Sequence, residues 1–174
     1  MTIAHAPTLD KFDRDVQVAV RIVLEAMQVA RSLESRPHAS TKPDRSPVTI
    51  ADVAIQAIAA VRLDDACPGD RLIAEEDASS LGDDPDASRQ IVETVGQIIP
   101  GATIALVAGW IREAGSRGNS RFWTLDPIDG TTGFIHGRQY VTALALVVDG
   151  RVEISVIGCP HLLLPVARGA PVVG

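Results

Sequence analysis

The chain has 174 residues, with 22 acidic and 16 basic side chains and a formal net charge of −6 at pH 7. This length corresponds to one ordinary domain or part of a larger one, and an apolar fraction of 46% is enough for a packed core. Because an acidic chain is a poor partner for a nucleic acid backbone, we expect no polymeric nucleic acid ligand.

The cysteines and the N-terminal sequence bear on the location of the protein. Cys67 and Cys159 lack the spacing of a metal site, and the simplest interpretation is two reduced thiols in a reducing compartment. The N-terminus lacks the basic-then-apolar pattern of a secretory signal, and no apolar run approaches the length of a membrane span. We therefore expect a cytoplasmic protein that does not bind a membrane.

The first part of the chain predicts a helix and then a loop. Apolar residues recur at helical spacing through residues 9–33, and Asp10 stands where it can cap the start. Residues 34–47 contain three prolines and several polar side chains, which predict a loop.

A second helix is predicted to run to about Ala66, with Ser46 or Thr49 as its cap. Asp52 falls in its first turn, where a carboxylate is favoured by the helix dipole. Taken alone, this structural role is the simpler interpretation of Asp52.

The middle of the chain predicts a short strand followed by acidic residues. Residues 71–74 form the strand, and Glu75, Glu76 and Asp77 follow it directly. An acidic triplet is most often a solvated surface or a helix start. The remaining elements are a surface loop at 78–89, helices at 89–99 and 102–114, and a connector at 115–121.

The stretch 122–134 carries the strongest chemical signal. Aromatic and apolar residues predict a buried strand that ends near Asp126, because Pro127 cannot donate a ladder hydrogen bond. Asp126 and Asp129 offer the oxygen ligands that Mg²⁺ prefers, and the amides of the glycine-bearing loop at 130–133 can face an anion. Asp-Pro and Asp-Gly pairs are also ordinary turn formers, but this run is longer than a turn requires.

A hairpin is predicted after this stretch. Residues 140–148 and 151–157 are apolar strands on either side of Asp149-Gly150, a favoured two-residue turn. The first arm is apolar on both faces, so we expect it to be the more central of the two.

Several of these segments resemble a known family. Residues 126–131, Asp-Pro-Ile-Asp-Gly-Thr, closely resemble the signature of the inositol monophosphatase-like, lithium-sensitive phosphatases. Within that superfamily, residues 46–52 with Gln56, and residues 143–150 followed by 158–160, are similar to the 3′(2′),5′-bisphosphate nucleotidases. Thr132 and His136-Gly137 are instead typical of inositol monophosphatases, whereas Gly133-Phe134 favours the nucleotidases.

The resemblance implies an α+β fold, namely the N-terminal part of the inositol monophosphatase-like (sugar phosphatase) fold. Two N-terminal helices and further helices would pack on a mainly antiparallel sheet. Residues 1–161 would form the N-terminal metal and phosphate domain, and residues 162–174 a divergent or truncated tail. The resemblance covers only the first half of a family member, and the family's later Trp-Asp metal motif has no counterpart in this sequence.

The implied function is a Mg²⁺-dependent phosphatase that removes the 3′-phosphate of adenosine 3′,5′-bisphosphate, with the sulfated relative PAPS as a further substrate. This activity belongs to sulfate assimilation and nucleotide salvage, and its partner is a small phosphorylated nucleotide. The alternatives are an inositol monophosphate phosphatase and a truncated, non-catalytic paralogue.

The resemblance also assigns metal ligands. A full-length family site holds two or three Mg²⁺ ions. Glu75, Asp126 and the Ile128 carbonyl would hold the first ion, and Asp126 and Asp129 the second. The remaining family ligand of the second ion is absent from this sequence.

The same resemblance assigns the other roles. The catalytic residues would be Asp52, Glu75 and Thr131, since the Thr131 hydroxyl and one of the two carboxylates would orient the attacking water. The amides of Gly130 and Thr131 would hold the phosphate. Glu76 would support Glu75, and His136 would have a loop role rather than act as a base.

Overall fold

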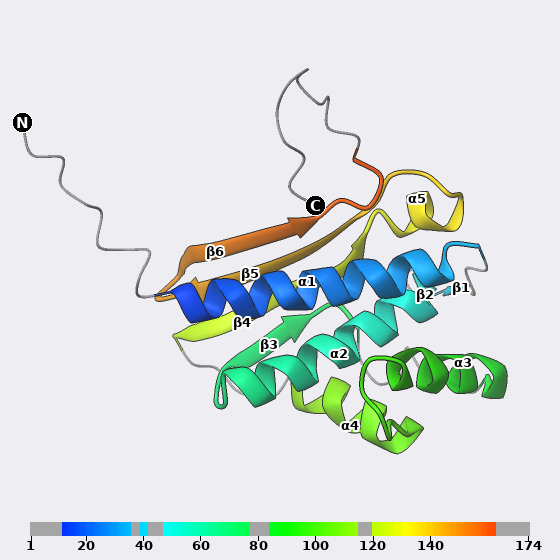
Figure 1. The fold of residues 1–174 in the computed structure, drawn as a ribbon, viewed down its shortest axis with the longest axis horizontal. Helices are drawn as coiled ribbons and strands as arrows, with labels where there is room; N and C mark the ends of the chain where they lie inside the picture. Colours follow the sequence, from blue (N-terminus) through cyan, green and yellow to red (C-terminus); the bar gives the residue numbers. More distant parts are fainter. Residues whose placement is uncertain (1–11, 36–38, 42–46, 77–83, 115–119, 163–174) are drawn as a thin grey trace, which may run out of the picture.

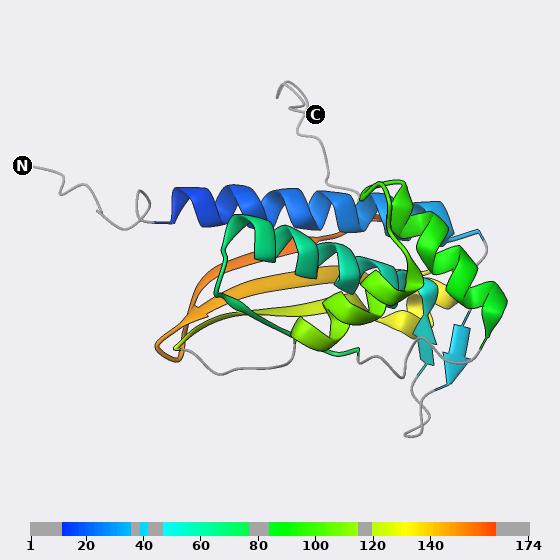
Figure 2. The ribbon, with the colours of Figure 1, turned by 90° about the horizontal axis from the view of Figure 1, so that it is seen from below.

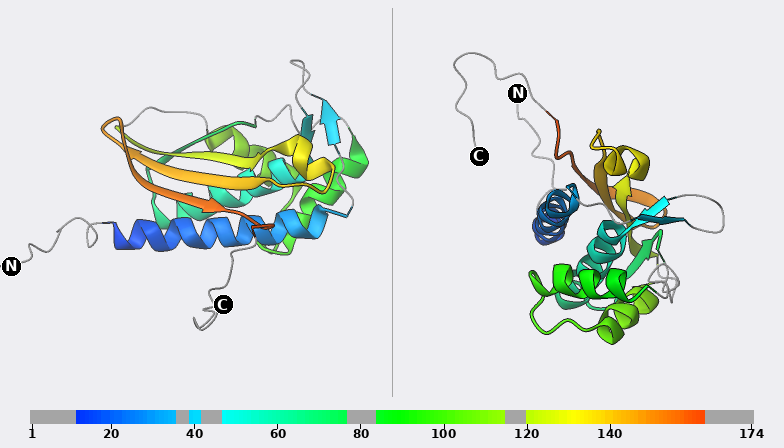
Figure 3. Two further views of the ribbon diagram at one scale, coloured as in Figure 1. Left: turned by 90° about the horizontal axis from the view of Figure 1, so that it is seen from above. Right: turned by 90° about the vertical axis from the view of Figure 1, so that its right-hand side faces the viewer.

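The computed structural model describes residues 12–35, 39–41, 47–76, 84–114 and 120–162. A four-stranded sheet lies against two long antiparallel helices, and two shorter helices lie beyond them (Figure 1, Figure 3). The long helices are α1 (Asp13–Leu33) and α2 (Ile50–Ala66). The strands of the sheet are β3 (Arg71–Ala74), β4 (Arg121–Asp129), β5 (Val141–Val148) and β6 (Arg151–Gly158).

The order of the strands is β3-β4-β5-β6, with β3 parallel to β4 and the other neighbours antiparallel. The expectation of helices on a mainly antiparallel sheet is therefore confirmed. The predicted hairpin is also present, with positive φ angles of 50° at Asp149 and 76° at Gly150, as its two-residue turn requires. β5 lies between β4 and β6, so the expectation that it is the more central arm of the hairpin is confirmed.

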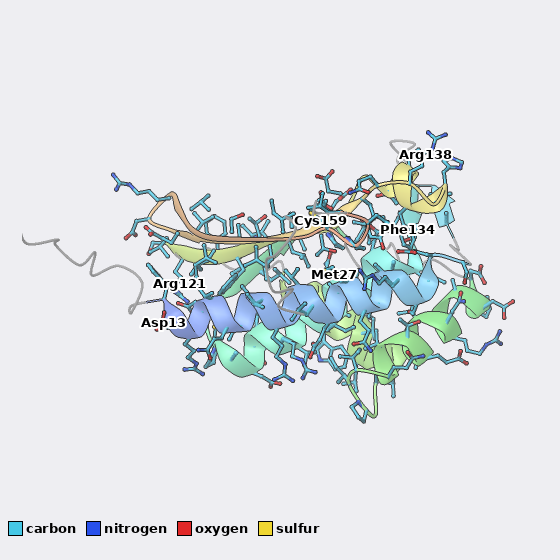
Figure 4. The ribbon with its side chains drawn as sticks, turned by 45° about the horizontal axis from the view of Figure 1, so that its top comes forward. Asp13, Met27, Arg121, Phe134, Arg138 and Cys159 are labelled. Atoms are coloured by element: carbon cyan, nitrogen blue, oxygen red, sulfur yellow. The ribbon has the colours of Figure 1, made fainter. Side chains whose placement is uncertain are left out.

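Helix α1 packs on the sheet through a single apolar face. It begins at Asp13 with Phe12 as its N-cap, later than the predicted start near residue 9, and the predicted cap Asp10 lies outside the described residues. At Gly158 in β6, a Cβ atom would lie within 2.8 Å of Val23 and Met27 side-chain atoms, so glycine allows the helix to approach the strand closely. Figure 4 shows Met27 on α1, below the end of the hairpin that carries Cys159.

Helix α2 is the centre of the fold. Every residue from Ile50 to Ala59 is buried, which suits a helix that is covered on all sides. α1 and the sheet cover part of it, and α3 (Pro85–Gly96) and α4 (Ile104–Ala114) cover the rest (Figure 2).

Two other expectations need correction. Helix α3 begins at Pro85 rather than at residue 89, because Asp84 caps it through hydrogen bonds from the amides of Asp86 and Ala87. In the stretch predicted as a loop, β1 (Ala39–Thr41) pairs with β2 (Pro47–Thr49) in an antiparallel ribbon. The other predicted loops and the tail fall mainly on residues outside the described ranges.

One end of the molecule is held together by charged side chains. Arg121 at the start of β4 contacts Asp15 of α1 at 2.7 Å and Asp70, just before β3, at 2.8 Å. The Trp123 indole also donates to Asp70, at 2.9 Å. Figure 4 shows Arg121 far from Phe134, which marks the opposite end of the molecule. No helix in the described part of the chain is long and apolar enough to cross a membrane.

Candidate metal and phosphate site

The acidic residues predicted from the sequence lie toward one end of the fold. α2 begins at this end, β3 and β4 both run toward it, and the short helix α5 (Thr131–Ile135) lies there (Figure 1). β3 and β4 pair in parallel with Ala74 opposite Leu125, so the next residues along, Glu75 and Asp126, are neighbours at the sheet edge. Paired strands are about 4.8 Å apart, so we expect the backbones of these two residues to lie side by side where β3 ends.

β4 continues beyond Asp126, contrary to the sequence-based expectation that it ends there. Its pairing with β5 shifts between Asp126 and Asp129, so that Pro127 and Ile128 together face Thr142. The Thr142 hydroxyl donates to the Pro127 carbonyl at 2.8 Å and so satisfies an acceptor inside this bulge. A bulge bends its strand and redirects the side chains. Asp129 is therefore displaced from the regular alternation that Asp126 follows.

The loop after Asp129 turns sharply into α5. Gly130 precedes this helix with φ of 92°, a conformation that glycine adopts without strain. The Thr131 hydroxyl donates to the Ile128 carbonyl at 3.0 Å, which ties the helix start to the bulge. The first amides of a helix have no carbonyl partner within the helix, so those of α5 can serve an anion.

The residues after α5 hold it in place from one side. The Arg138 amide donates to the Gly133 carbonyl at 2.7 Å, and a Cβ atom at Gly133 would lie 2.3 Å from the Gln139 carbonyl oxygen. The rings of Phe134 and Tyr140 meet edge to face with their centroids 5.0 Å apart. The position of α5 therefore depends on a glycine that lets the following chain cross it closely.

Asp52 lies in the first turn of α2, as expected, and it also caps the helix together with Thr49. Its carboxylate accepts hydrogen bonds from the Thr49 amide at 2.8 Å and the Thr49 hydroxyl at 2.6 Å. Only 1% of the residue is exposed. Burial raises the pKa of Asp52 to about 7, the two Thr49 hydrogen bonds oppose this rise, and the negative charges of Glu76 and Glu75 add to it. Asp52 is therefore both a cap and a member of the acidic group.

The two glutamates after β3 have different surroundings. Glu75 is exposed, whereas Glu76 is 5% exposed. The buried Gln56 side chain donates to the Glu76 carbonyl at 2.6 Å and accepts from the Glu76 amide at 2.9 Å. Sequence reasoning noted Gln56 only as part of the family resemblance and did not predict this contact. The available signal was a polar side chain in an otherwise apolar helix, one turn after Asp52.

The donor atoms fit a hard cation in type. Asp52, Glu75, Asp126 and Asp129 supply carboxylate oxygens at one end of the fold, and Mg²⁺ takes oxygen ligands. Asp126 is half-buried, with its Oδ1 atom shielded from solvent. Within the described ranges, however, no three or more His, Cys, Asp and Glu side chains converge closely enough to hold a metal ion.

The comparison with protein families agrees with the fold and the site. The model of the inositol monophosphatase family matches residues 9–170, so the chain belongs to this family. Among curated proteins, it is 38% identical over 171 residues to a 3′(2′),5′-bisphosphate nucleotidase of Schizosaccharomyces pombe, covering 87% of this chain and 48% of that protein. It is 35% identical to 3′(2′),5′-bisphosphate nucleotidase 1 of Candida albicans, covering 90% of this chain and 48% of that protein.

Solved structures give the same fold. The IMPase of Thermotoga maritima superposes with a TM-score of 0.58 at 19% identity, covering 84% of this chain and 44% of that structure. The expected inositol monophosphatase-like fold is thereby confirmed. The chain spans about half the length of the curated relatives it matches.

Proposed function

We propose that this chain carries the metal and phosphate site of a Mg²⁺-dependent phosphomonoester hydrolase. The supporting observation is the parallel pairing of β3 with β4, which makes Glu75 and Asp126 neighbours beside the Gly130 turn. Because the chain belongs to the inositol monophosphatase family, we interpret these two carboxylates as ligands of a metal ion. Residues 1–161 would form the domain that carries the site.

The ligands would come from the residue that follows β3 and from the last part of β4. Glu75 at the end of β3, Asp126, the Ile128 carbonyl and Asp129 would hold the cations. The Ile128 carbonyl accepts from Thr131 and has a second lone pair for a cation. Bound Mg²⁺ would supply Lewis acidity and a water of lowered pKa. The number of ions, two or three in a full-length site, belongs to the same proposal.

The remaining residues would orient the water and the phosphate. The Thr131 hydroxyl, together with Glu75 or Asp52, would align the attacking oxygen opposite the leaving group. The amides of Gly130 and Thr131 would donate to the phosphate oxygens. Asp52 is held by Thr49 in a fixed position, which suits an orienting rather than a mobile group.

The proposed substrate is adenosine 3′,5′-bisphosphate, with PAPS as a second substrate and a place in sulfur metabolism. The names of the bisphosphate nucleotidases that this chain resembles support this choice. Lithium sensitivity and a cytoplasmic location are further parts of the proposal. An inositol monophosphate is the alternative substrate, favoured by Thr132 and His136-Gly137 in the loop after Gly130.

A non-catalytic chain is the second candidate. It is favoured by the carboxylates of the described residues, which form no closed ligand set. Such a chain would bind a divalent cation weakly and turn over no phosphate ester.

The deciding experiment measures phosphate release with Mg²⁺ from adenosine 3′,5′-bisphosphate and from inositol 1-phosphate. Asp126→Asn removes a proposed ligand, and Asp86→Asn, at an exposed site in α3, is the matched control. Release from the nucleotide that is abolished only by Asp126→Asn supports the nucleotidase. Preference for the inositol ester moves the assignment to the alternative substrate, and no release from folded protein refutes catalysis by this chain.

A further inference from the structure

Gln56 makes an unusual contact for a side chain in the middle of a buried helix. Its amide group makes two hydrogen bonds to a single backbone unit, donating to the Glu76 carbonyl at 2.6 Å and accepting from the Glu76 amide at 2.9 Å. The residue is 1% exposed, and Glu76 is 5% exposed. The side chain thus does for residue 76 what a neighbouring strand does for a residue of a sheet.

The residues around Gln56 make this contact costly to lose. Its neighbours in α2, from Val53 to Ala59, are buried and otherwise apolar. A buried amide without hydrogen-bond partners destabilises the folded chain. If helix packing were the only role of this position, an apolar side chain would serve equally well. The two bonds to Glu76 are the feature that an apolar side chain cannot reproduce.

The contact fixes the chain just where it leaves the sheet. β3 ends at Ala74, so Glu75 and Glu76 lie beyond the last paired residue of the strand. Asp52 and Gln56 are one turn apart on α2 and therefore share one side of the helix. One of them is held by Thr49, and the other holds Glu76. Helix α2 thereby sets the distance between Asp52 and the acidic pair after β3.

We propose that Gln56 is a positioning residue of the divalent-cation site, acting by clamping the Glu76 backbone so that Glu75 is presented beside Asp126. This inference rests on the proposed function, because it takes Glu75 as a cation ligand. Gln56 itself contacts neither cation nor substrate. Groups that orient metal ligands typically change metal affinity 10- to 100-fold when they are replaced.

The test is titration calorimetry of Mg²⁺ with the 174-residue chain. Gln56→Met keeps the length of the side chain but removes both hydrogen bonds, and we expect its Kd for Mg²⁺ to rise roughly 10-fold or more. Gln28→Met is the matched control, because Gln28 is exposed on α1, and its Kd should equal that of the parent. Gln56→Asn withdraws the amide by one methylene and serves as a milder variant if the methionine variant does not fold.

A double-mutant cycle separates positioning from general support of the fold. If Gln56 acts through Glu75, adding Gln56→Met to Glu75→Gln should change the Kd little beyond the effect of Glu75→Gln alone. Equal affinities of folded Gln56 variants and parent would overturn the inference, and so would independent, additive effects in the cycle. If the parent binds Mg²⁺ and only Glu75→Gln weakens it, the proposed cation site stands and this inference alone fails. A parent that binds no Mg²⁺ would overturn both.

Discussion

Replacing Asp52 with asparagine tests whether the buried carboxylate opposes folding near neutral pH. The amide oxygen of asparagine can still accept from the Thr49 amide, so the helix cap is retained. The negative charge, however, is removed from a site that is 1% exposed. We therefore expect Asp52→Asn to be more stable than the parent at alkaline pH, in the absence of divalent cations.

The size of the effect follows from the pKa of Asp52, raised from 3.8 to about 7 on folding, chiefly by burial. Between these values the folded chain binds more protons than the unfolded chain, so stability falls as pH rises. A difference of about three pKa units corresponds to roughly 4 kcal/mol, because one unit is about 1.4 kcal/mol. The stabilisation that comes from protonated Asp52 is fully present below pH 3.8 and is lost above about pH 7.

The assay is urea unfolding at about pH 5 and about pH 8, with a chelator present. Between these two pH values, the free energy of unfolding should fall by roughly 3 kcal/mol more in the parent than in Asp52→Asn. The reason is that most of the pKa difference of Asp52 lies in this interval. Asp64→Asn, at an exposed position of the same helix, is the control and should behave like the parent. An equal loss in the parent and in Asp52→Asn would refute the argument that burial of Asp52 governs this pH dependence.

Three further substitutions test the packing around the site, in α4 and at the far end. Gly133→Ala places a methyl group against the Gln139 carbonyl and should lower the free energy of unfolding by about 1–3 kcal/mol, measured by urea unfolding. Gly109→Ala in α4 meets no atom within 4 Å among the described residues outside its helix, and should instead stabilise by up to about 1 kcal/mol. Arg121→Gln breaks both ion pairs at the far end, and should lower the Tm while leaving the calorimetric Kd for Mg²⁺ unchanged. A stable Gly133→Ala, or a changed Mg²⁺ affinity in Arg121→Gln, would contradict these assignments.

The parts of the fold that depend on residues close together in the chain could be predicted from the sequence. The turn at Asp149-Gly150 follows from local backbone preferences, and helix α2 (Ile50–Ala66) follows from its Thr49 cap and its apolar content. The bulge after Asp126 could not be predicted, because it is stabilised by Thr142 on the next strand. The start of α3 at Pro85 could have been predicted from Asp84-Pro85, a typical cap and first-turn pair.

The acidic residues of the site were recognisable because their order in the chain is a family pattern. Their relative placement was not, since it depends on the register of β3 and β4 and on Gln56, whose partner is 20 residues away. The pattern also did not indicate that Glu75 is exposed while Glu76 is buried. That difference arises from the alternation of sides where the chain leaves β3.

The pairing of β3 with β4 has a consequence for the order of folding. β5 and β6 are joined by a two-residue turn, whereas Arg71 of β3 pairs with Phe122, about 50 residues along the chain. Closing so long a loop costs more entropy than closing a hairpin, and distant contacts form more slowly. The hairpin is thus expected to form early and β3 to join the sheet late. The carboxylates of Glu75 and Asp126 would then be brought together only near the end of folding, after much of the apolar core has already formed.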